Sequence, residues 1–269
     1  MKKFFRIIGA LIGIPILVYF LMSMANLFIL KLIGQINHIN IYKESATQLN
    51  NLLSPYIYVG STIGEFLAVI LLIIIYLPSN EGLIKRCKFK KFSLNKLPII
   101  LCLIIGFSIL SIVYIHLTQG MFKSYTAVEK NLSVVHQSIL GVIGTIILVP
   151  IFEEIIFRAT IFGTLKRNLN IIIALILQAL VFSIMHGNIL QMSYTFFLGL
   201  ILALVFLYTG SLFGDIICHI TFNLFGVLIL PIISYFYYNS IIYVIIGVCL
   251  LFISFILYRR NKKSLQIFN

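Results

Sequence analysis

Two neighbouring glutamates and an arginine lie inside an apolar run of the sequence, where charged side chains are costly. The run reads Pro150-x-x-Glu153-Glu154-x-x-x-Arg158. A charge at the centre of a bilayer costs roughly 2.5–3.5 kcal/mol on insertion scales, so such residues usually serve a function. Glu154 and Arg158 are four residues apart and share a helix face, which predicts an ion pair. Glu153 is rotated by about 100° from Glu154, so one arginine does not easily serve both carboxylates, and an unpaired buried carboxylate suits a general base.

Histidines on two later apolar runs could complete a site for hydrolysis. Phe182 and His186 are four residues apart, and so are His219 and Asn223, which places each pair on one side of its helix. A single buried histidine is more often a hydrogen-bonded structural residue, and polar side chains can join helices without chemistry. The joint occurrence on three runs favours a shared site. Glutamate and histidine can activate water, and histidine and asparagine can donate to an oxyanion.

Three residues receive a plainer interpretation. Glu65 lies alone in an earlier apolar run, directly after Gly64, and we assign it no role. Asp215 is interpreted as a residue at the start of its helix, and Phe182 as a packing residue. The sequence also contains no H-E-x-x-H zinc motif.

The elements that must position these residues are membrane-spanning helices. The 269-residue chain is 61% hydrophobic and 10% charged, which is more apolar than a soluble core requires. A span needs roughly 20 mostly apolar residues. Eight runs approach that length, at 7–30, 56–78, 97–118, 137–161, 170–186, 190–208, 213–233 and 239–258. We therefore predict an all-α, polytopic membrane protein with about eight transmembrane helices and a polar cavity between helices 4, 5 and 7.

The chain is expected to form a single membrane domain over residues 1–269. Residues 1–136 would hold helices 1–3 with their loops, 137–233 the catalytic core of helices 4–7, and 239–258 the final helix. The largest loops are too short to bury a core of their own.

The net charge of +13 could indicate nucleic-acid binding, but the positions of the basic residues favour a membrane topology. Lys and Arg collect beside the apolar runs, as cytoplasmic anchors do. With the N-terminus inside, the inner segments hold 15 Lys and Arg, whereas the outer segments hold only Lys31, Lys43, Lys123 and Lys130. This distribution predicts a multi-pass protein of the cell membrane with both termini in the cytoplasm, in contact with the lipid bilayer and not with nucleic acid.

The three motifs, in this order, resemble those of the CPBP family of intramembrane proteases. That family includes the CAAX prenyl endopeptidases and bacterial proteins associated with bacteriocin processing and immunity. The matching residues are Glu153-Glu154-x-x-x-Arg158, Phe182-x-x-x-His186 and His219-x-x-x-Asn223. The G-S-L-F-G-D stretch before His219 also resembles the family's lead-in. The resemblance covers about residues 140–225, and the first 136 residues carry no match to it.

The resemblance implies hydrolysis of a peptide bond within or beside the membrane. It assigns water activation to Glu153 and His186, positioning of the water or stabilisation of the oxyanion to His219 and Asn223, and support to Glu154 and Arg158. It also leaves the cofactor open. Glu153, His186 and His219 could hold a divalent metal such as Zn²⁺ with water as the fourth ligand, or a glutamate-dependent mechanism could need no metal.

Two other classes of function remain as alternatives. A non-enzymatic immunity or scaffold protein could use the same fold, and a transporter could use the polar cluster as an ion path. A transporter would be expected to show inverted repeats, and the sequence contains no convincing repeat. The expected partner is a membrane-associated peptide or protein tail, such as a peptide pheromone or bacteriocin precursor, because the Ile-, Lys- and Asn-rich composition points to a bacterial source without prenylated proteins.

The helix order sets one geometric condition on this site. Upright helices would place His186 near the outer side of the membrane and His219 near the inner side, with Glu153 between them. The three side chains can meet only if helices are tilted or if the fifth helix begins deeper in the membrane.

Overall fold

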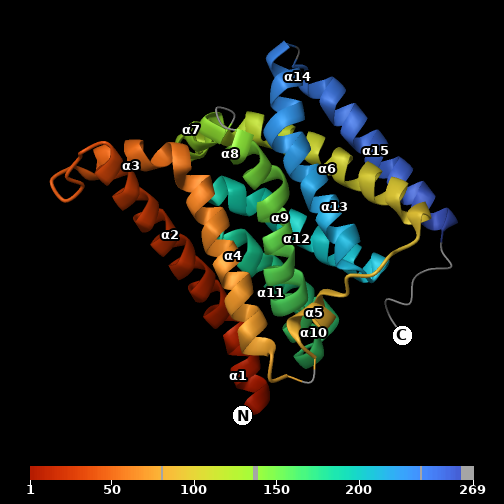
Figure 1. Cartoon of the computed structure of the whole chain (residues 1–269). Coiled ribbons are helices and arrows are strands. Elements are labelled where there is room, and N and C mark those ends of the chain that lie inside the picture. The colour runs from red at the N-terminus through yellow and green to blue at the C-terminus, as the bar shows by residue number, and fades with distance from the viewer. Residues whose placement is uncertain (80, 136–138, 237, 262–269) are drawn as a thin grey trace.

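The computed structural model describes residues 1–79, 81–135, 139–236 and 238–261, which contain helices and no strand (Figure 1). Within these ranges, seven helical segments are long and apolar enough to cross a membrane. They are Lys2–Ile36, Ala46–Tyr76, Leu94–Met121, Ile139–Asn168, Ile189–Thr209, Leu212–Phe236 and Ser240–Arg260. The prediction of an all-α, multi-pass membrane protein is therefore confirmed.

The first half of the chain forms three of these segments and two shorter helices. The first segment joins α1 (Lys2–Ile8), the π-helical η1 (Gly9–Gly13) and α2 (Ile14–Ile36). The second joins α3 (Ala46–Leu53), η2 (Ser54–Tyr56) and α4 (Ile57–Tyr76). After α5 (Leu83–Cys87), the third joins η3 (Leu94–Lys96), α6 (Leu97–Thr118) and η4 (Gln119–Met121), and α7 (Tyr125–Val135) follows.

The second half contains the residues with predicted roles. The fourth segment consists of α8 (Ile139–Ile143), the π-helical η5 (Gly144–Leu148), α9 (Val149–Glu154), the π-helical η6 (Ile155–Phe162) and α10 (Gly163–Asn168). It is followed by α11 (Ile171–Ile184) and α12 (Ile189–Thr209). The remaining elements are α13 (Leu212–Asn223), the π-helical η7 (Leu224–Ile229), α14 (Leu230–Phe236) and α15 (Ser240–Arg260). The start predicted for the fourth span, residue 137, lies outside the described residues.

The helix expected as the fifth span, over 170–186, is shorter than a full crossing. It is α11, which has 14 residues and is therefore about 21 Å long, against about 30 Å of hydrocarbon. Gly187 then turns the chain with a positive φ of 69°, and Asn188 caps α12. The eight expected crossings are thus seven long segments and one short helix.

A π-helical stretch and a proline precede the two glutamates in the fourth segment. Pro150 lacks the N–H that would bond to the preceding turn, a gap that can kink a helix. In the structure the chain stays helical through Pro150, and the preceding residues Gly144–Leu148 form the π-helical η5. A π stretch absorbs such a gap by shifting to i+5 hydrogen bonds, and stretches of this kind are frequent at functional sites.

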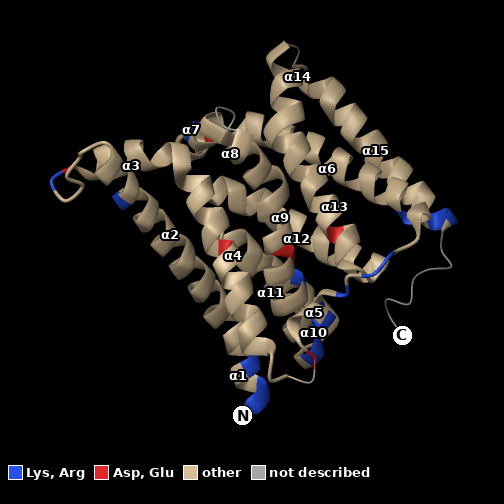
Figure 2. Ribbon diagram, in the orientation of Figure 1, with Lys and Arg blue, Asp and Glu red and all other residues tan. Residues whose placement is uncertain are grey.

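Charged side chains divide into two groups in this bundle (Figure 2). Lys and Arg collect on α1, α5 and α10 and in the connection from α5 to η3, towards the end of the bundle that holds the N-terminus, and also at the end of α15. Acidic residues on α4, at the end of α9 and in the first turn of α13 lie instead in the interior of the bundle. The second group marks the candidate site.

Close contact between α2 and α4 fixes the orientation of one of these acidic residues. A Cβ added at Gly64 would overlap the backbone of Met22 on α2, so α4 approaches α2 to a distance that only glycine allows. Glu65 is the next residue on α4 and is rotated by about 100° from that contact. Phe66 on the same helix lies 5.7 Å from Phe152 of α9 between ring centroids.

We expect Gly64→Ala to destabilise the protein, because the added methyl group forces α2 and α4 apart. Overpacking of this kind costs about 1–3 kcal/mol. The matched control is Gly226→Ala in η7, where an added Cβ would meet nothing within 4 Å. The midpoint of thermal unfolding in detergent should fall for Gly64→Ala and stay equal or rise for Gly226→Ala. Equal midpoints for the two variants would contradict the close contact.

Candidate active site

A buried ion-pair network on α9, η6 and α13 forms the base of the site. Arg158 is fully buried, and its Nε lies 3.0 Å from Glu154 Oε2 and 3.7 Å from Asp215 Oδ2. Both carboxylates are also fully buried. The pair predicted from the spacing of Glu154 and Arg158 is therefore present, and a second carboxylate joins it. One guanidinium group between two carboxylates is a strong interaction because water does not screen it.

His219 connects this network to Glu153. Its Nδ1 lies 2.7 Å from Glu154 Oε1, and its Nε2 lies 3.5 Å from Glu153 Oε2. The imidazole is buried, whereas 15% of the Glu153 side chain is exposed. Glu154 therefore orients the ring through Nδ1 and leaves Nε2 facing the second carboxylate. Glu153 is the more accessible of the two adjacent glutamates, as its rotation away from Arg158 predicted.

Phe182 holds the two histidines on one side of the network. Its ring centroid lies 5.0 Å from that of His186 and 5.8 Å from that of His219. The guanidinium carbon of Arg158 lies 4.6 Å from the same centroid, a distance at which a cation interacts favourably with a ring face. The sequence predicted only a packing role for Phe182. In the structure it contacts three of the residues with predicted roles.

The hydrogen bond of His186 defines the free nitrogen of its ring. Nδ1 lies 2.9 Å from the carbonyl oxygen of Phe182, one turn earlier on α11. A carbonyl oxygen only accepts, so Nδ1 carries the proton and Nε2 keeps its lone pair. This arrangement suits a base or a ligand, because the lone pair remains available for a water molecule. The shortness of α11 meets the condition set by the helix order, since His186 and His219 both reach Phe182.

Asn223 lies one turn after His219, at the end of α13. Its Nδ2 donates to the carbonyl oxygen of Thr145 in η5 at 2.9 Å. This bond ties α13 to the π-helical stretch that precedes α9, and it orients the amide. The second hydrogen of Nδ2 remains for another acceptor.

Glu65, to which the sequence assigns no role, is also buried in the bundle. Its side chain is 4% exposed, and Oε2 has no hydrogen-bond partner among the described residues. It interacts electrostatically with Glu153. Two carboxylates from α4 and α9 therefore lie near each other inside the bundle. A lone glutamate in an apolar run could have marked Glu65 as a candidate site residue. Its proximity to Glu153 could not be predicted, because the two residues lie on different helices.

Asp215 is the other residue whose contact the sequence did not predict. It lies in the first turn of α13, as expected, but Ser211 caps the helix and Asp215 turns inward to Arg158. The G-S-L-F-G-D stretch carried a signal, because the aspartate there is spaced four residues before His219 on the same helix face.

The described residues do not form a ready metal site. No group of three His, Cys, Asp or Glu side chains among them is arranged to hold a metal ion. Nδ1 of His219 is taken by Glu154, which leaves Nε2, 3.5 Å from Glu153 Oε2, as the nitrogen that could join a metal with Glu153. The three proposed ligands are not arranged around one position among the described residues, and we route no step through a metal.

A cavity of about 770 Å³ lies in the structure, but the residues with predicted catalytic roles do not line it. The side chains from helices 4, 5 and 7 meet as expected, through α9, α11 and α13. They meet by direct contact, so the large cavity belongs to another part of the bundle.

The geometry thus describes a membrane protein with a buried Glu–His–Asn site, and comparison with known proteins specifies the class. The family model described as "Type II CAAX prenyl endopeptidase Rce1-like" matches residues 135–225. A Bacillus subtilis (strain 168) protein named "Putative membrane peptidase YdiL" is 28% identical over 109 residues. The match covers 40% of this chain and 45% of that relative. No solved structure matches the chain. Both matches confirm the resemblance to the CPBP family of membrane proteases.

We expect Arg158→Leu to destabilise the protein strongly, because it leaves Glu154 and Asp215 buried without a cation. Breaking a buried ion pair costs about 3–5 kcal/mol. The control is Arg167→Leu, which breaks the exposed pair with Glu81 and should cost about 0–1 kcal/mol. Urea unfolding in detergent micelles would measure both variants. A loss for Arg158→Leu no larger than for Arg167→Leu would show that the network is not structural.

Proposed function

We propose that the protein is an intramembrane endopeptidase that hydrolyses a peptide bond in a membrane-associated peptide or protein tail. The observation that carries the proposal is the position of His219, whose two ring nitrogens face Glu153 and Glu154 while its ring and that of His186 contact Phe182. Three motifs that are far apart in sequence thereby meet at one place. The family match supports a membrane peptidase.

In the proposed mechanism, Glu153 and His186 activate one water molecule between them. Glu153 accepts a proton from the water as the hydroxide attacks the carbonyl carbon of the substrate. His186 binds the water through the lone pair on Nε2. Breakdown of the tetrahedral intermediate returns the proton from Glu153 to the leaving amine, so that the carboxylate is regenerated and one water is consumed per bond broken.

His219 and Asn223 are proposed to stabilise the oxyanion that forms at the carbonyl oxygen. Because Nδ1–H of His219 already donates to Glu154, His219 does so as an imidazolium, whose Nε2–H is the donor. The side chains lie one helical turn apart and are held by Glu154 and by the carbonyl of Thr145. Donors that are already oriented need no rearrangement as charge develops, which makes them effective in a site with little water. Glu154, Arg158 and Asp215 act through His219 by holding its ring in place.

We expect Glu153→Ala to abolish cleavage while the protein still inserts and folds, because Glu153 lies outside the buried Arg158 pair. Loss of a general base lowers rates by about 10²–10⁴-fold. Peptides released from cells that express the wild type, Glu153→Ala or the control Glu129→Ala would be compared by mass spectrometry. Glu129 lies exposed on α7, so its removal should leave the products unchanged.

The same comparison separates the proposal from its alternative. A non-enzymatic immunity or scaffold protein would keep its biological effect with Glu153→Ala. Normal processing by a well-folded Glu153→Ala protein would refute the endopeptidase.

We also propose that both termini lie in the cytoplasm, on the basis of the clustered basic residues (Figure 2). The test uses two exposed lysines, Lys43 between α2 and α3 and Lys91 between α5 and η3. In intact cells a membrane-impermeant maleimide should label Lys43→Cys above the background of the parent protein. Lys91→Cys should be labelled only after the membrane is opened. The reverse pattern would contradict the orientation.

A further inference from the structure

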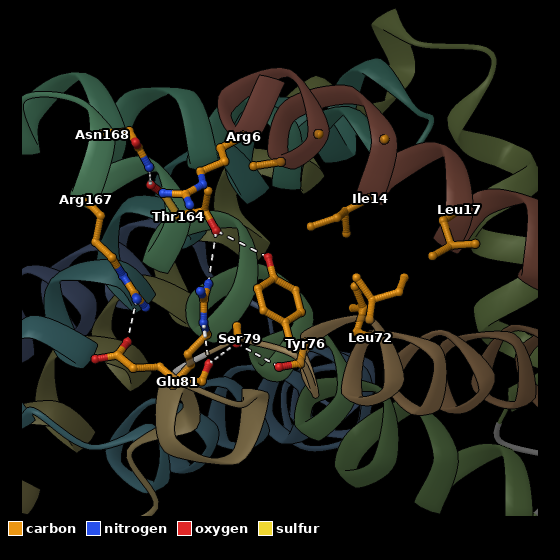
Figure 3. A pocket seen from close by; sticks show the side chains of 15 residues that line it. Arg6, Ile14, Leu17, Leu72, Tyr76, Ser79, Glu81, Thr164, Arg167 and Asn168 are labelled. Carbon is orange, nitrogen blue, oxygen red and sulfur yellow. Dashed lines mark hydrogen bonds and ion pairs between the residues drawn. The ribbon is translucent and has the colours of Figure 1, made fainter. Parts of the chain in front are cut away.

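The cavity of about 770 Å³ lies near the N-terminus, between the α1–η1–α2 segment, α4, α5 and α10 (Figure 3). Figure 3 shows that its two sides differ in character. Arg6, Thr164, Arg167 and Glu81 gather on one side, whereas Ile14, Leu17 and Leu72 lie on the other. The cavity is therefore amphipathic, with a polar and an apolar end.

Three arginines and one carboxylate, that of Glu81, line the polar end. Arg167 Nη1 pairs with Glu81 Oε2 at 2.5 Å. Arg86 is held by its Nε, which donates to the Glu81 carbonyl oxygen at 3.1 Å, and by its Nη1, which donates to Thr164 Oγ1 at 3.4 Å. Partial burial, followed by the nearby charges of Arg167 and Arg6, contributes to lowering the pKa of Arg86. Three cations against one anion leave a net positive charge for a ligand to neutralise.

The apolar end continues from this cluster between the first segment and α4. It is lined by Ile14, Leu17, Leu72 and Ile75. Gly9 and Gly13 also line it, and a Cβ added at either would meet nothing within 4 Å. Two residues without side chains thus keep one wall of the cavity open. Ile75 is 60% exposed, so this end reaches the surface on which lipid tails lie.

We propose that this cavity binds one anionic phospholipid, with its phosphate on Arg6, Arg86 and Arg167 and an acyl chain along the apolar end. Guanidinium groups match phosphate oxygens in pairs, and basic pockets between transmembrane helices bind anionic headgroups. The volume lies in the range of small-molecule sites. A free phosphate ion would satisfy the arginines but would leave the apolar end unfilled.

The absence of tryptophan from the chain provides a direct test. Ile75→Trp places one fluorophore at the rim of the cavity. The protein is reconstituted in phosphatidylcholine vesicles that contain phosphatidylglycerol, with brominated acyl chains on one lipid or the other to quench nearby tryptophan. We expect phosphatidylglycerol to be preferred over phosphatidylcholine at this reporter by at least about fivefold, because each nearby basic residue contributes about that factor.

A second reporter controls for general attraction of anionic lipid to basic residues. Phe255→Trp on α15 is also on an exposed position, and Arg259 lies 5.9 Å from the Phe255 ring. Phe255 does not line the cavity. The preference at this position should be several-fold weaker. An equal preference at both reporters would overturn the proposal.

Two further substitutions in the Ile75→Trp background distinguish the effect of the arginine charges from the effect of the open cavity. Arg6→Gln, at an exposed residue, should weaken the preference roughly fivefold. Gly13→Leu fills the cavity without changing its charge and should abolish the preference for phosphatidylglycerol. If neither change alters quenching, the cavity is not the lipid site. Sodium phosphate, compared with sodium chloride at equal ionic strength, should not displace the lipid, and full displacement would assign the site to free phosphate instead.

Discussion

The buried guanidinium group of Arg158 is the interaction on which the rest of the site depends. It is fully buried, and among the described residues Glu154 and Asp215 are the carboxylates that pair with it. Because these carboxylates come from two helices, the ion pairs fix α13 against the fourth membrane segment. The same Glu154 then orients His219. The buried charge of Arg158 therefore holds Glu154 in place, and Glu154 orients the His219 ring towards Glu153.

Local departures from regular helix geometry bring the three motifs together. α11 is too short to cross the bilayer, and it ends where His186 reaches Phe182. The π-helical stretches η5 and η6 flank the two glutamates, and η7 follows Asn223. Thr145, within η5, accepts the hydrogen bond from Asn223. Regular, upright helices of equal length would have separated the two histidines in depth.

The sequence predicted the helical class and the multi-pass membrane character, because apolar run length is a local property, and spacing within one helix nominated the candidate site residues. The pair formed by Glu154 and Arg158 follows directly from such spacing. The contacts of Asp215 with Arg158 and of Phe182 with His219, and the burial of Glu65 on α4, could not be predicted in this way. They depend on how α13, α4 and α11 pack against α9 and η6, and that packing is set by small residues such as Gly64 and by the length of α11. The assignment of catalytic roles remains a proposal.

The proposed catalytic site and the proposed lipid site lie in different parts of the bundle but share the fourth membrane segment. Glu153 and Arg158 lie in its middle, and Thr164 and Arg167 lie at its end. A lipid held at that end would anchor the segment at the membrane surface.

A double-mutant cycle on Glu153 and His186 tests the central claim, that α9 and α11 supply groups to one water molecule. Cleavage rates would be measured for purified Glu153→Gln, His186→Gln and the double variant, on a peptide identified as a product of the wild type. Residues that act as a unit are strongly non-additive. The account predicts that the double variant is about as slow as the slower single variant. Rate losses that multiply would show that the two residues act independently and would contradict a shared site.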